Sequence, residues 1–141
     1  MSTFRIIGLF LLGSFFVAPT QAQKKMYNKL VWQDDFLKNG LPDSTKWSYD
    51  VAHGCPKICG WGNNEIQYYT EARKENARVE NGYLIIEARK EKFEDANYTS
   101  ARLVTKNKGD WKYGRMVIRA KIPTGKGLWP AGWILPTHKV Y

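Results

Sequence analysis

Carboxylates are the first groups to consider, because paired Asp and Glu side chains can donate and accept protons or attack an electrophile. The chain has 13 of them. Residues two apart on a strand point to the same face, so two carboxylates at that spacing could act together. The nearest arrangements are Asp34-Asp35 and Glu91-Lys-Phe-Glu94-Asp95, which are adjacent or three apart. We therefore expect no catalytic carboxylate pair among the 141 residues.

The two cysteines, Cys55 and Cys59, are separated by three residues in His53-Gly-Cys-Pro-Lys-Ile-Cys-Gly. A disulfide between them is the interpretation that we favour, because the N-terminal leader described next predicts an oxidising compartment. Free thiols and a metal site are the alternatives. His53 and two thiolates would supply three ligands, whereas a structural metal site uses about four.

Residues 1–22 have the pattern of a secretory signal peptide. A basic start, Met1 to Arg5, precedes a nearly unbroken apolar run from Ile6 to Ala18, and Thr20-Gln21-Ala22 has the small residues suited to cleavage after Ala22. The alternative is an uncleaved membrane anchor, but the apolar run has about 13 residues, short of the roughly 20 that span a bilayer. We predict a secreted protein, extracellular or periplasmic, with a mature part at residues 23–141 and no stable membrane insertion after cleavage.

The charge and the aromatic content of the chain indicate which classes of binding partner to expect. The net charge of +9 and the pI near 9.6 raise the question of nucleic acid, but the basic residues are scattered and no run of five like charges occurs, so we expect no nucleic-acid partner. The chain is rich in aromatic residues with a polar group, with six Trp and eight Tyr. Such residues suit stacking on sugars or bases, and they also suit an ordinary β-core.

The elements that must position these groups are predicted from period-two patterns, which indicate strands. The expected strands are Leu30 to Phe36, Ile66 to Thr70, Tyr83 to Lys90, Tyr98 to Thr105 and Arg115 to Ile122. Turn sequences separate them, and Asn81-Gly82 suits a hairpin before an apolar run. Glu71 to Glu80 has a helix-favouring composition but no apolar stripe, so we expect a loop there.

Several short strands at this spacing predict an all-β sandwich or barrel. The last residues, Trp133 to Tyr141, follow an apolar, Trp-rich run without a polar tail. A sandwich that stopped there would expose apolar surface and an unpaired edge. We therefore expect the domain to be incomplete in this chain.

Four stretches, in order along the chain, resemble glycoside hydrolase family 16, and in particular its laminarinase-like endo-β-1,3-glucanases. They are Val31-Trp-Gln-Asp-Asp-Phe36, Gly60-Trp-Gly-Asn-Asn-Glu-Ile-Gln-Tyr-Tyr-Thr70, Tyr98-Thr-Ser-Ala-Arg-Leu-Val-Thr105 and Gly127-Leu-Trp-Pro-Ala-Gly-Trp-Ile-Leu-Pro136. The resemblance implies a concanavalin-like β-jelly-roll sandwich of two curved antiparallel sheets, with a glycan across the concave face. It covers only the N-terminal half of such a domain.

The resemblance also implies hydrolysis with retention, in which one Glu attacks the anomeric carbon and another transfers the proton. The family's signature for these residues, Glu-x-Asp-x-(x)-Glu, would lie beyond Tyr141. We therefore predict that this fragment alone is inactive and that its residues serve binding. A non-catalytic β-glucan-binding protein of the same fold is the main alternative, and a relative acting on mixed-linkage glucan, agar, carrageenan or xyloglucan is another.

Five side chains match positions that contact sugar in the family. Trp129 would stack on a sugar ring, although by composition alone a core position would be favoured, and Trp133 either contacts sugar or packs. Asn64 would bind sugar hydroxyls while Asn63 makes the turn. Arg102 would bind hydroxyls or, alternatively, form a cross-strand ion pair. The motif gives Glu65 no catalytic role, so a structural role that holds Arg102 or the loop is expected.

The remaining implications concern ions, modification and partners. Many members carry a structural calcium ion, and the matching ligand positions here would be near Asp35 and Gly82; no other cofactor is required. Asn97-Tyr98-Thr99 is an N-glycosylation sequon. The expected partner is a β-glucan polysaccharide or oligosaccharide, bound by a monomer.

Overall fold

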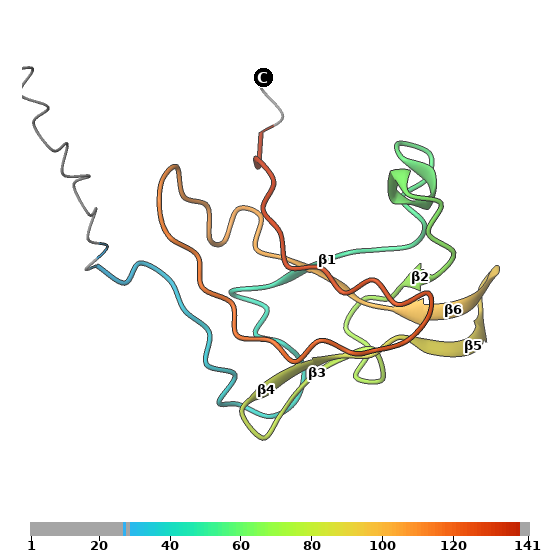
Figure 1. The fold of residues 1–141 in the computed structure, drawn as a ribbon, viewed down its shortest axis with the longest axis horizontal. Helices are drawn as coiled ribbons and strands as arrows, with labels where there is room; N and C mark the ends of the chain where they lie inside the picture. The colour runs from blue at the N-terminus through green and yellow to red at the C-terminus, as the bar shows by residue number, and fades with distance from the viewer. Residues whose placement is uncertain (1–26, 28, 139–141) are drawn as a thin grey trace, which may run out of the picture.

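The computed structural model describes residues 27 and 29–138, so the predicted signal peptide lies outside the described residues. The described part contains seven strands and one short 3₁₀ turn (Figure 1). In chain order these are β1 (Ser48–Asp50), η1 (Cys59–Gly62), β2 (Tyr68–Tyr69), β3 (Ala77–Glu80), β4 (Tyr83–Ile86), β5 (Arg89–Phe93), β6 (Ala96–Ser100) and β7 (Arg102–Val104). The strand-rich architecture confirms the all-β fold class.

The hairpin between β3 and β4 forms where the turn sequence predicted it. Asn81 has φ 51° and Gly82 has φ 80°, a left-handed conformation that Asn and Gly tolerate better than other residues. A two-residue turn with both φ values positive matches the twist of the flanking strands. Glu80 and Tyr83 are accordingly paired across the turn, and β3 and β4 run antiparallel.

The expected loop from Glu71 to Glu80 is wrong over its last four residues, which are β3. Ala77 and Val79 are buried there, whereas Glu80 is exposed. This is the alternation of a half-buried strand. This alternation spans only four residues and lies inside a charged stretch. The sequence pattern was therefore too short to indicate a strand, and a loop was expected.

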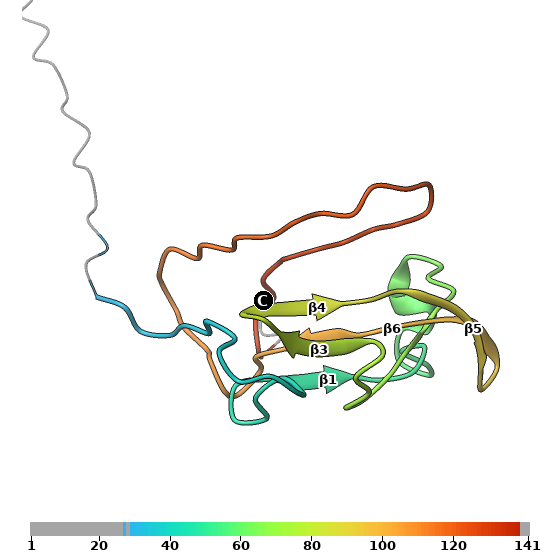
Figure 2. The ribbon, with the colours of Figure 1, turned by 90° about the horizontal axis from the view of Figure 1, so that it is seen from below.

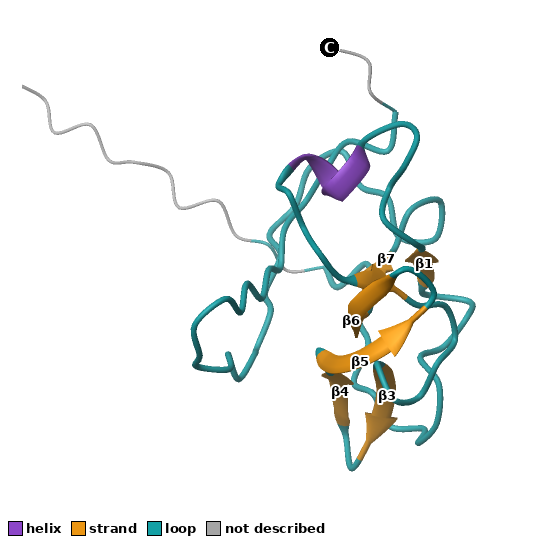
Figure 3. Ribbon diagram, turned by 90° about the vertical axis from the view of Figure 1, so that its right-hand side faces the viewer, coloured by secondary structure: helices purple, strands orange, loops and turns teal. Residues whose placement is uncertain are grey.

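The predicted strand from Tyr98 to Thr105 is present as two consecutive strands, β6 and β7, separated by the buried Ala101. β6 pairs with β5 antiparallel and with β2 parallel, and β7 pairs with β1 antiparallel. An additional bridge joins Ala52, just after β1, to Tyr69 of β2. Figure 3 shows β7 and β1 side by side and β5 and β6 below them. This pairing brings β1, β2 and β7 together from distant parts of the chain.

The other strand predictions are confirmed in part. Tyr83 to Lys90 divides into β4 and the start of β5, because pairing changes from β3 to β6 between them. From Ile66 to Thr70, only Tyr68 and Tyr69 form a strand.

The interior combines small apolar residues with a buried polar network. Ala77, Val79, Ala96 and Ala101 are its buried apolar residues within the described part. Asn76 is fully buried among them and is hydrogen-bonded to four neighbours. Buried amides are stable only when such partners are present. The network therefore links the residue before β3 to the connection between β4 and β5 and to β6.

The predicted strand from Leu30 to Phe36 is wrong, because the segment is irregular and its aromatic residues pack instead. Trp32 lies edge-on to Trp47 at 5.6 Å and to Trp111 at 5.8 Å between ring centroids. Phe36 stacks on Trp47, whose indole Nε1 donates to Asp34 at 2.8 Å. The alternation in this segment thus follows contacts between aromatic side chains and not a ladder of backbone hydrogen bonds.

The predicted strand from Arg115 to Ile122 is also wrong in this structure. The chain after β7 runs out and back as a long arm without strands (Figure 2). Within the described residues, no backbone hydrogen bond connects this segment to another. A strand exists only by pairing with a neighbour. Met116, Ile118 and Ile122 accordingly stay at least half exposed.

Nothing in the described part of the chain forms a helix with the length and apolar character needed to cross a membrane.

Candidate functional site

Arg102 is the centre of the candidate site. It begins β7, directly opposite Asp50 of β1 in the strand register. Its Nε lies 3.0 Å from Asp50 Oδ2 in an ion pair, and the Arg102 side chain is 19% exposed. The structure therefore contains the cross-strand ion pair that was the alternative to sugar contact. The closest approach of this ion pair is through Nε, so the two Nη atoms are the part of the guanidinium that could reach a ligand.

Two indole rings contact the Arg102 guanidinium. Its Cζ lies 4.4 Å from the Trp61 ring centroid and 5.1 Å from that of Trp133. Both distances are within the range of favourable cation–π contact. Trp61 belongs to η1 and Trp133 to the arm after β7, so the site gathers three separate segments around one cation.

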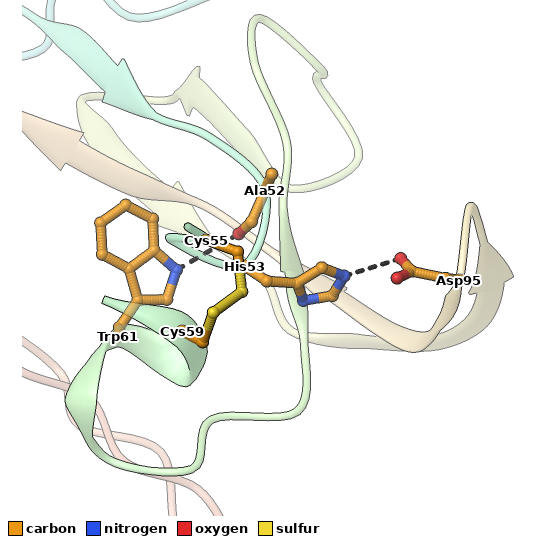
Figure 4. The surroundings of a disulfide bond; sticks show 6 residues. All are labelled: Ala52, His53, Cys55, Cys59, Trp61 and Asp95. Atoms are coloured by element: carbon orange, nitrogen blue, oxygen red, sulfur yellow. Dashed lines mark hydrogen bonds and ion pairs between the residues drawn. A yellow bond between two sulfur atoms is a disulfide. The ribbon is translucent and has the colours of Figure 1, made fainter. Parts of the chain in front are cut away.

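Trp61 is itself anchored. Its indole Nε1 donates to the carbonyl oxygen of Ala52 at 3.2 Å (Figure 4). On the same loop, a Cβ added to Gly54 would lie 3.0 Å from Trp61 Cδ2, so the glycine allows the backbone to approach the ring closely. Cys55 and Cys59 are joined by a disulfide. Residues of this loop thus contact the Trp61 indole through a hydrogen bond and through the close approach of Gly54.

His53 lies next to Ala52 at the start of this loop and contacts a carboxylate from another turn. Its Nε2 lies 2.7 Å from Asp95 Oδ1 in the turn between β5 and β6 (Figure 4). Hydrogen bonding to His53 lowers the pKa of Asp95. The disulfide leaves neither cysteine as a free thiol, and the described residues contain no group of three or more His, Cys, Asp or Glu side chains placed to hold a metal ion.

Glu65 organises the loop next to Arg102. Its carboxylate accepts hydrogen bonds from Asn63 Nδ2 at 3.2 Å, Gln67 Nε2 at 2.6 Å and Tyr69 Oη at 2.7 Å. Burial opposes ionisation of Glu65, but these hydrogen bonds and the charge of Arg102 outweigh it and lower its pKa. With both oxygens engaged, Glu65 serves to hold the loop, as the motif implied.

Tyr69, which donates a hydrogen bond to Glu65, has a perturbed pKa for related reasons. Burial, followed by the hydrogen bond to Glu65 and the charge of that carboxylate, raises the pKa of Tyr69 to about 12. Its ring also lies 5.8 Å from that of Trp61. Tyr69 therefore connects the Glu65 carboxylate to the indole that contacts Arg102.

The roles predicted for the two asparagines are partly exchanged. Asn64 has the left-handed backbone, with φ 55°, whereas Asn63 has φ −126°. Asn63 instead uses its amide to reach Glu65 and the carbonyl oxygen of Trp61. The expectation that Asn63 would supply the left-handed turn is therefore wrong, because the turn is sharpest one residue later. Whether Asn64 binds sugar stays a prediction.

The two tryptophans of the arm differ in their contacts. Trp133 packs against Arg102 and is still 57% exposed. Trp129 is 71% exposed, so its ring face is available for stacking. Apolar residues along the same unpaired arm, such as Val117 and Ile134, are exposed to a similar degree, so exposure alone does not separate a binding role from a core role. The contact of either ring with a sugar stays a prediction.

The predicted calcium ligands, Asp35 and Gly82, lie in two separate segments of the described part. The Asp35 carboxylate accepts a hydrogen bond from Gln33 at 2.9 Å. The nearest link between its segment and the Gly82 turn is the bond from Asn81 N to Asn39 Oδ1, at 3.0 Å. Oxygen atoms suited to calcium are present in both segments, and a calcium ion held near Asp35 and Gly82 stays a prediction.

Three residues around Arg102 were not predicted as site residues: Trp61, Asp50 and Tyr69. Trp61 and Tyr69 lie inside the motif that carries the family resemblance, so the motif itself was the available signal. Asp50 has no signal in the sequence, because only the β1–β7 pairing places it opposite Arg102. Exposed indole faces beside a planar set of N–H donors can hold the C–H face and the hydroxyls of a sugar.

Comparison with known proteins identifies relatives of this chain, although no family model matches it. It is 52% identical over 131 residues to a β-glucanase of Rhodothermus marinus, covering 93% of this chain and 44% of the relative. It is 42% identical over 117 residues to a glucan endo-1,3-β-glucosidase of Cryptopygus antarcticus, covering 79% of this chain and 40% of the relative. The chain thus spans less than half the length of these relatives.

Solved structures agree with the sequence matches. The laminarinase of Rhodothermus marinus superposes with a TM-score of 0.56 at 60% identity, over 61% of this chain and 32% of that structure. A non-specific endo-β-1,3(4)-glucanase from family GH16, crystallised with a glucan oligosaccharide, superposes with a TM-score of 0.55 at 47% identity, over 61% and 34%. The fold is therefore that of the laminarinase jelly rolls. The chain is a homologue of the laminarinase-type β-glucanases of glycoside hydrolase family 16, over part of their length.

Proposed function

We propose that this chain is the glucan-binding N-terminal part of a retaining endo-β-1,3-glucanase. The observation that carries the proposal is the Arg102 site, in which residues from three of the four family motifs meet: Trp61, Arg102 and Trp133. The identity of 52% to a β-glucanase over 93% of the chain supports the same conclusion.

In this proposal the sugar contacts are divided among the exposed groups. Trp129 supplies a ring face for stacking, and the Nη atoms of Arg102 and the amide of Asn64 bind hydroxyls. Because the sequence contains no suitably spaced carboxylate pair, the attacking Glu and the proton donor would have to come from sequence that follows Tyr141. The 141-residue chain alone would then bind glucan without cleaving it.

A second candidate is a non-catalytic β-glucan-binding protein. It is favoured by a specific observation: one relative is a β-1,3-glucan-binding protein of Penaeus monodon, 51% identical over 43 residues that cover 30% of this chain and 12% of that protein. Every predicted contact in this chain would serve such a protein equally well.

Two experiments test the proposal. Affinity electrophoresis of the chain in gels containing laminarin should show retardation, and gels containing the uncharged polymer xyloglucan should not. Equal mobility in all gels would refute glucan binding. Reading the coding sequence past the Tyr141 codon then separates the candidates: a Glu-x-Asp-x-(x)-Glu strand supports the hydrolase, and its absence leaves a binding protein.

Export and calcium belong to the same proposal. We propose that the leader at residues 1–22 directs secretion, which N-terminal sequencing of the protein from culture medium would test by finding Gln23 first. We further propose that any calcium ion near Asp35 and Gly82 needs ligands from outside the described residues. Added calcium should therefore not raise the unfolding temperature of this chain, and a clear rise would show that the residues present suffice.

A further inference from the structure

We propose that Trp61 is a positioning residue, which holds the Arg102 guanidinium so that its Nη atoms face a bound glucan. The inference deepens the proposed function and rests on it. Its basis is the contact of 4.4 Å between Arg102 Cζ and the Trp61 ring centroid, the shorter of the two indole contacts to this cation.

An arginine side chain needs such support to recognise hydroxyls. It has many rotamers, and a planar fork of donors is selective only when its orientation is fixed. In this structure the Asp50 carboxylate holds Nε, at 3.0 Å, and the indole of Trp61 holds the guanidinium. The Nη atoms then remain for neighbouring hydroxyls of a sugar, which accept hydrogen bonds from such a fork.

Trp61 is more rigidly held than a residue that merely covers the surface. Its Nε1 bonds to the Ala52 carbonyl oxygen, and the Gly54 backbone lies against its ring. Its backbone is left-handed, with φ 52° and ψ 24°, a conformation that a bulky residue rarely adopts. An observed outlier of this kind marks a position that its surroundings enforce, and such positions concentrate at binding sites.

The anchoring passes from the loop to the cation. The disulfide between Cys55 and Cys59 closes the turn that precedes η1, and the Ala52–Tyr69 bridge ties the start of the same loop to β2. The loop thus begins directly after β1, the strand paired with the one that carries Arg102, and is also bonded to β2, which lies in another sheet. Because the Trp61 ring is held by this loop and contacts the guanidinium, it restricts the orientation of Arg102.

The test compares two substitutions of Trp61 in the full chain. Trp61→Asn removes the ring and keeps a residue that tolerates the left-handed backbone, and Trp61→Phe keeps an aromatic face. Titration with laminarihexaose should give a dissociation constant about tenfold weaker for Trp61→Asn, equivalent to about 1.4 kcal/mol, and most of the affinity should return in Trp61→Phe. Trp111→Asn removes a comparable, part-exposed indole from another cluster, and it should bind like the wild type.

A double-mutant cycle separates positioning from direct sugar contact. In the Arg102→Ala background, Trp61→Asn should have no further effect, because the two residues act through one interaction. An equal loss in both backgrounds would show that Trp61 contacts the sugar itself, and would overturn the proposal. Unchanged affinity of both Trp61 variants would overturn it as well.

A second measurement does not depend on glucan. The side-chain protons of Arg102 should show an upfield ring-current shift in the NMR spectrum of the free chain, and Trp61→Asn should reduce it. If the wild type binds no laminarihexaose, the proposed function fails, and the ring-current shift still decides whether Trp61 holds Arg102. An Arg102 spectrum that is the same with and without the Trp61 ring would refute the contact.

Discussion

Asn76 offers a direct test of the buried polar network, because its side chain joins four neighbours: three in connecting segments and Thr99 in β6. Its Oδ1 accepts from Thr70 Oγ1 at 2.9 Å and from Arg73 Nη1 at 3.0 Å. Its Nδ2 donates to the Glu87 carbonyl oxygen at 3.1 Å and to Thr99 Oγ1 at 2.9 Å. Asn76 and Thr99 are both 0% exposed.

The cost of Asn76→Ala follows from these contacts. A hydrogen bond contributes about 1 kcal/mol net, and a buried group that loses its partner costs about 1–3 kcal/mol. Arg73 keeps its bonds to Glu91, and the Thr99 hydroxyl still donates to Glu91, so part of the network persists. We therefore expect the free energy of unfolding to fall by ~3 kcal/mol, a large share of what a small domain has.

Urea unfolding followed by tryptophan fluorescence measures this loss. Asn39→Ala is the matched control, because Asn39 is exposed and its side chain makes one bond, to Asn81 N at 3.0 Å. The control should lose less than about 1 kcal/mol. An Asn76→Ala variant within about 0.5 kcal/mol of the wild type, the range of ordinary surface changes, would refute the view that this network stabilises the fold.

Three further predictions concern ionisation and backbone conformation. Hydrogen bonds from Arg73 and then Thr99 lower the pKa of Glu91 from 4.5 to about 2. The stabilisation from ionised Glu91 is therefore present above pH 4.5 and is lost as the pH falls toward 2. In Glu91→Gln, the free energy of unfolding should fall less steeply between pH 4.5 and 2 than in the wild type, and an unchanged fall would contradict this. The pKa of Tyr69, raised to about 12 by burial and a neighbouring carboxylate, means that its contribution is present below pH 10 and is lost as the pH rises toward 12. Tyrosinate absorbance should accordingly show one more phenol ionising well above pH 10 in the wild type than in Tyr69→Phe, and equal numbers of such phenols in the two proteins would argue against it. Gly54→Ala should cost more stability than Gly82→Ala in thermal unfolding, because both have positive φ but only at Gly54 would the new Cβ lie 2.6 Å from a backbone oxygen; equal losses would show that the loop yields.

Local features were predictable because they depend on few residues. The Asn81-Gly82 hairpin follows from the left-handed preference of two adjacent residues. The disulfide joins two cysteines that have three residues between them. Each of these features closes over a handful of bonds, so the sequence nearby contains most of the information.

Strand predictions failed where the pattern was clear but the partner was not. Arg115 to Ile122 alternates more regularly than β3, yet β3 is a strand and the longer segment is not. Alternation tells which side chains share a face. It does not supply the neighbouring backbone whose hydrogen bonds make a strand, and β3 has β4 while Arg115 to Ile122 has none in the described part.

The candidate site shows the same division. By itself the sequence determined the motifs that contain Asn63, Asn64, Arg102, Trp129 and Trp133, and the family that they resemble. Only the tertiary structure decided that Asp50 faces Arg102, that Trp61 and Trp133 contact its guanidinium, and that Asn64 and not Asn63 takes the left-handed turn. The reason is physical: residue types limit which interactions are possible, but pairing between distant strands determines which groups come within a few ångströms of each other, where hydrogen bonds and cation–π contacts act.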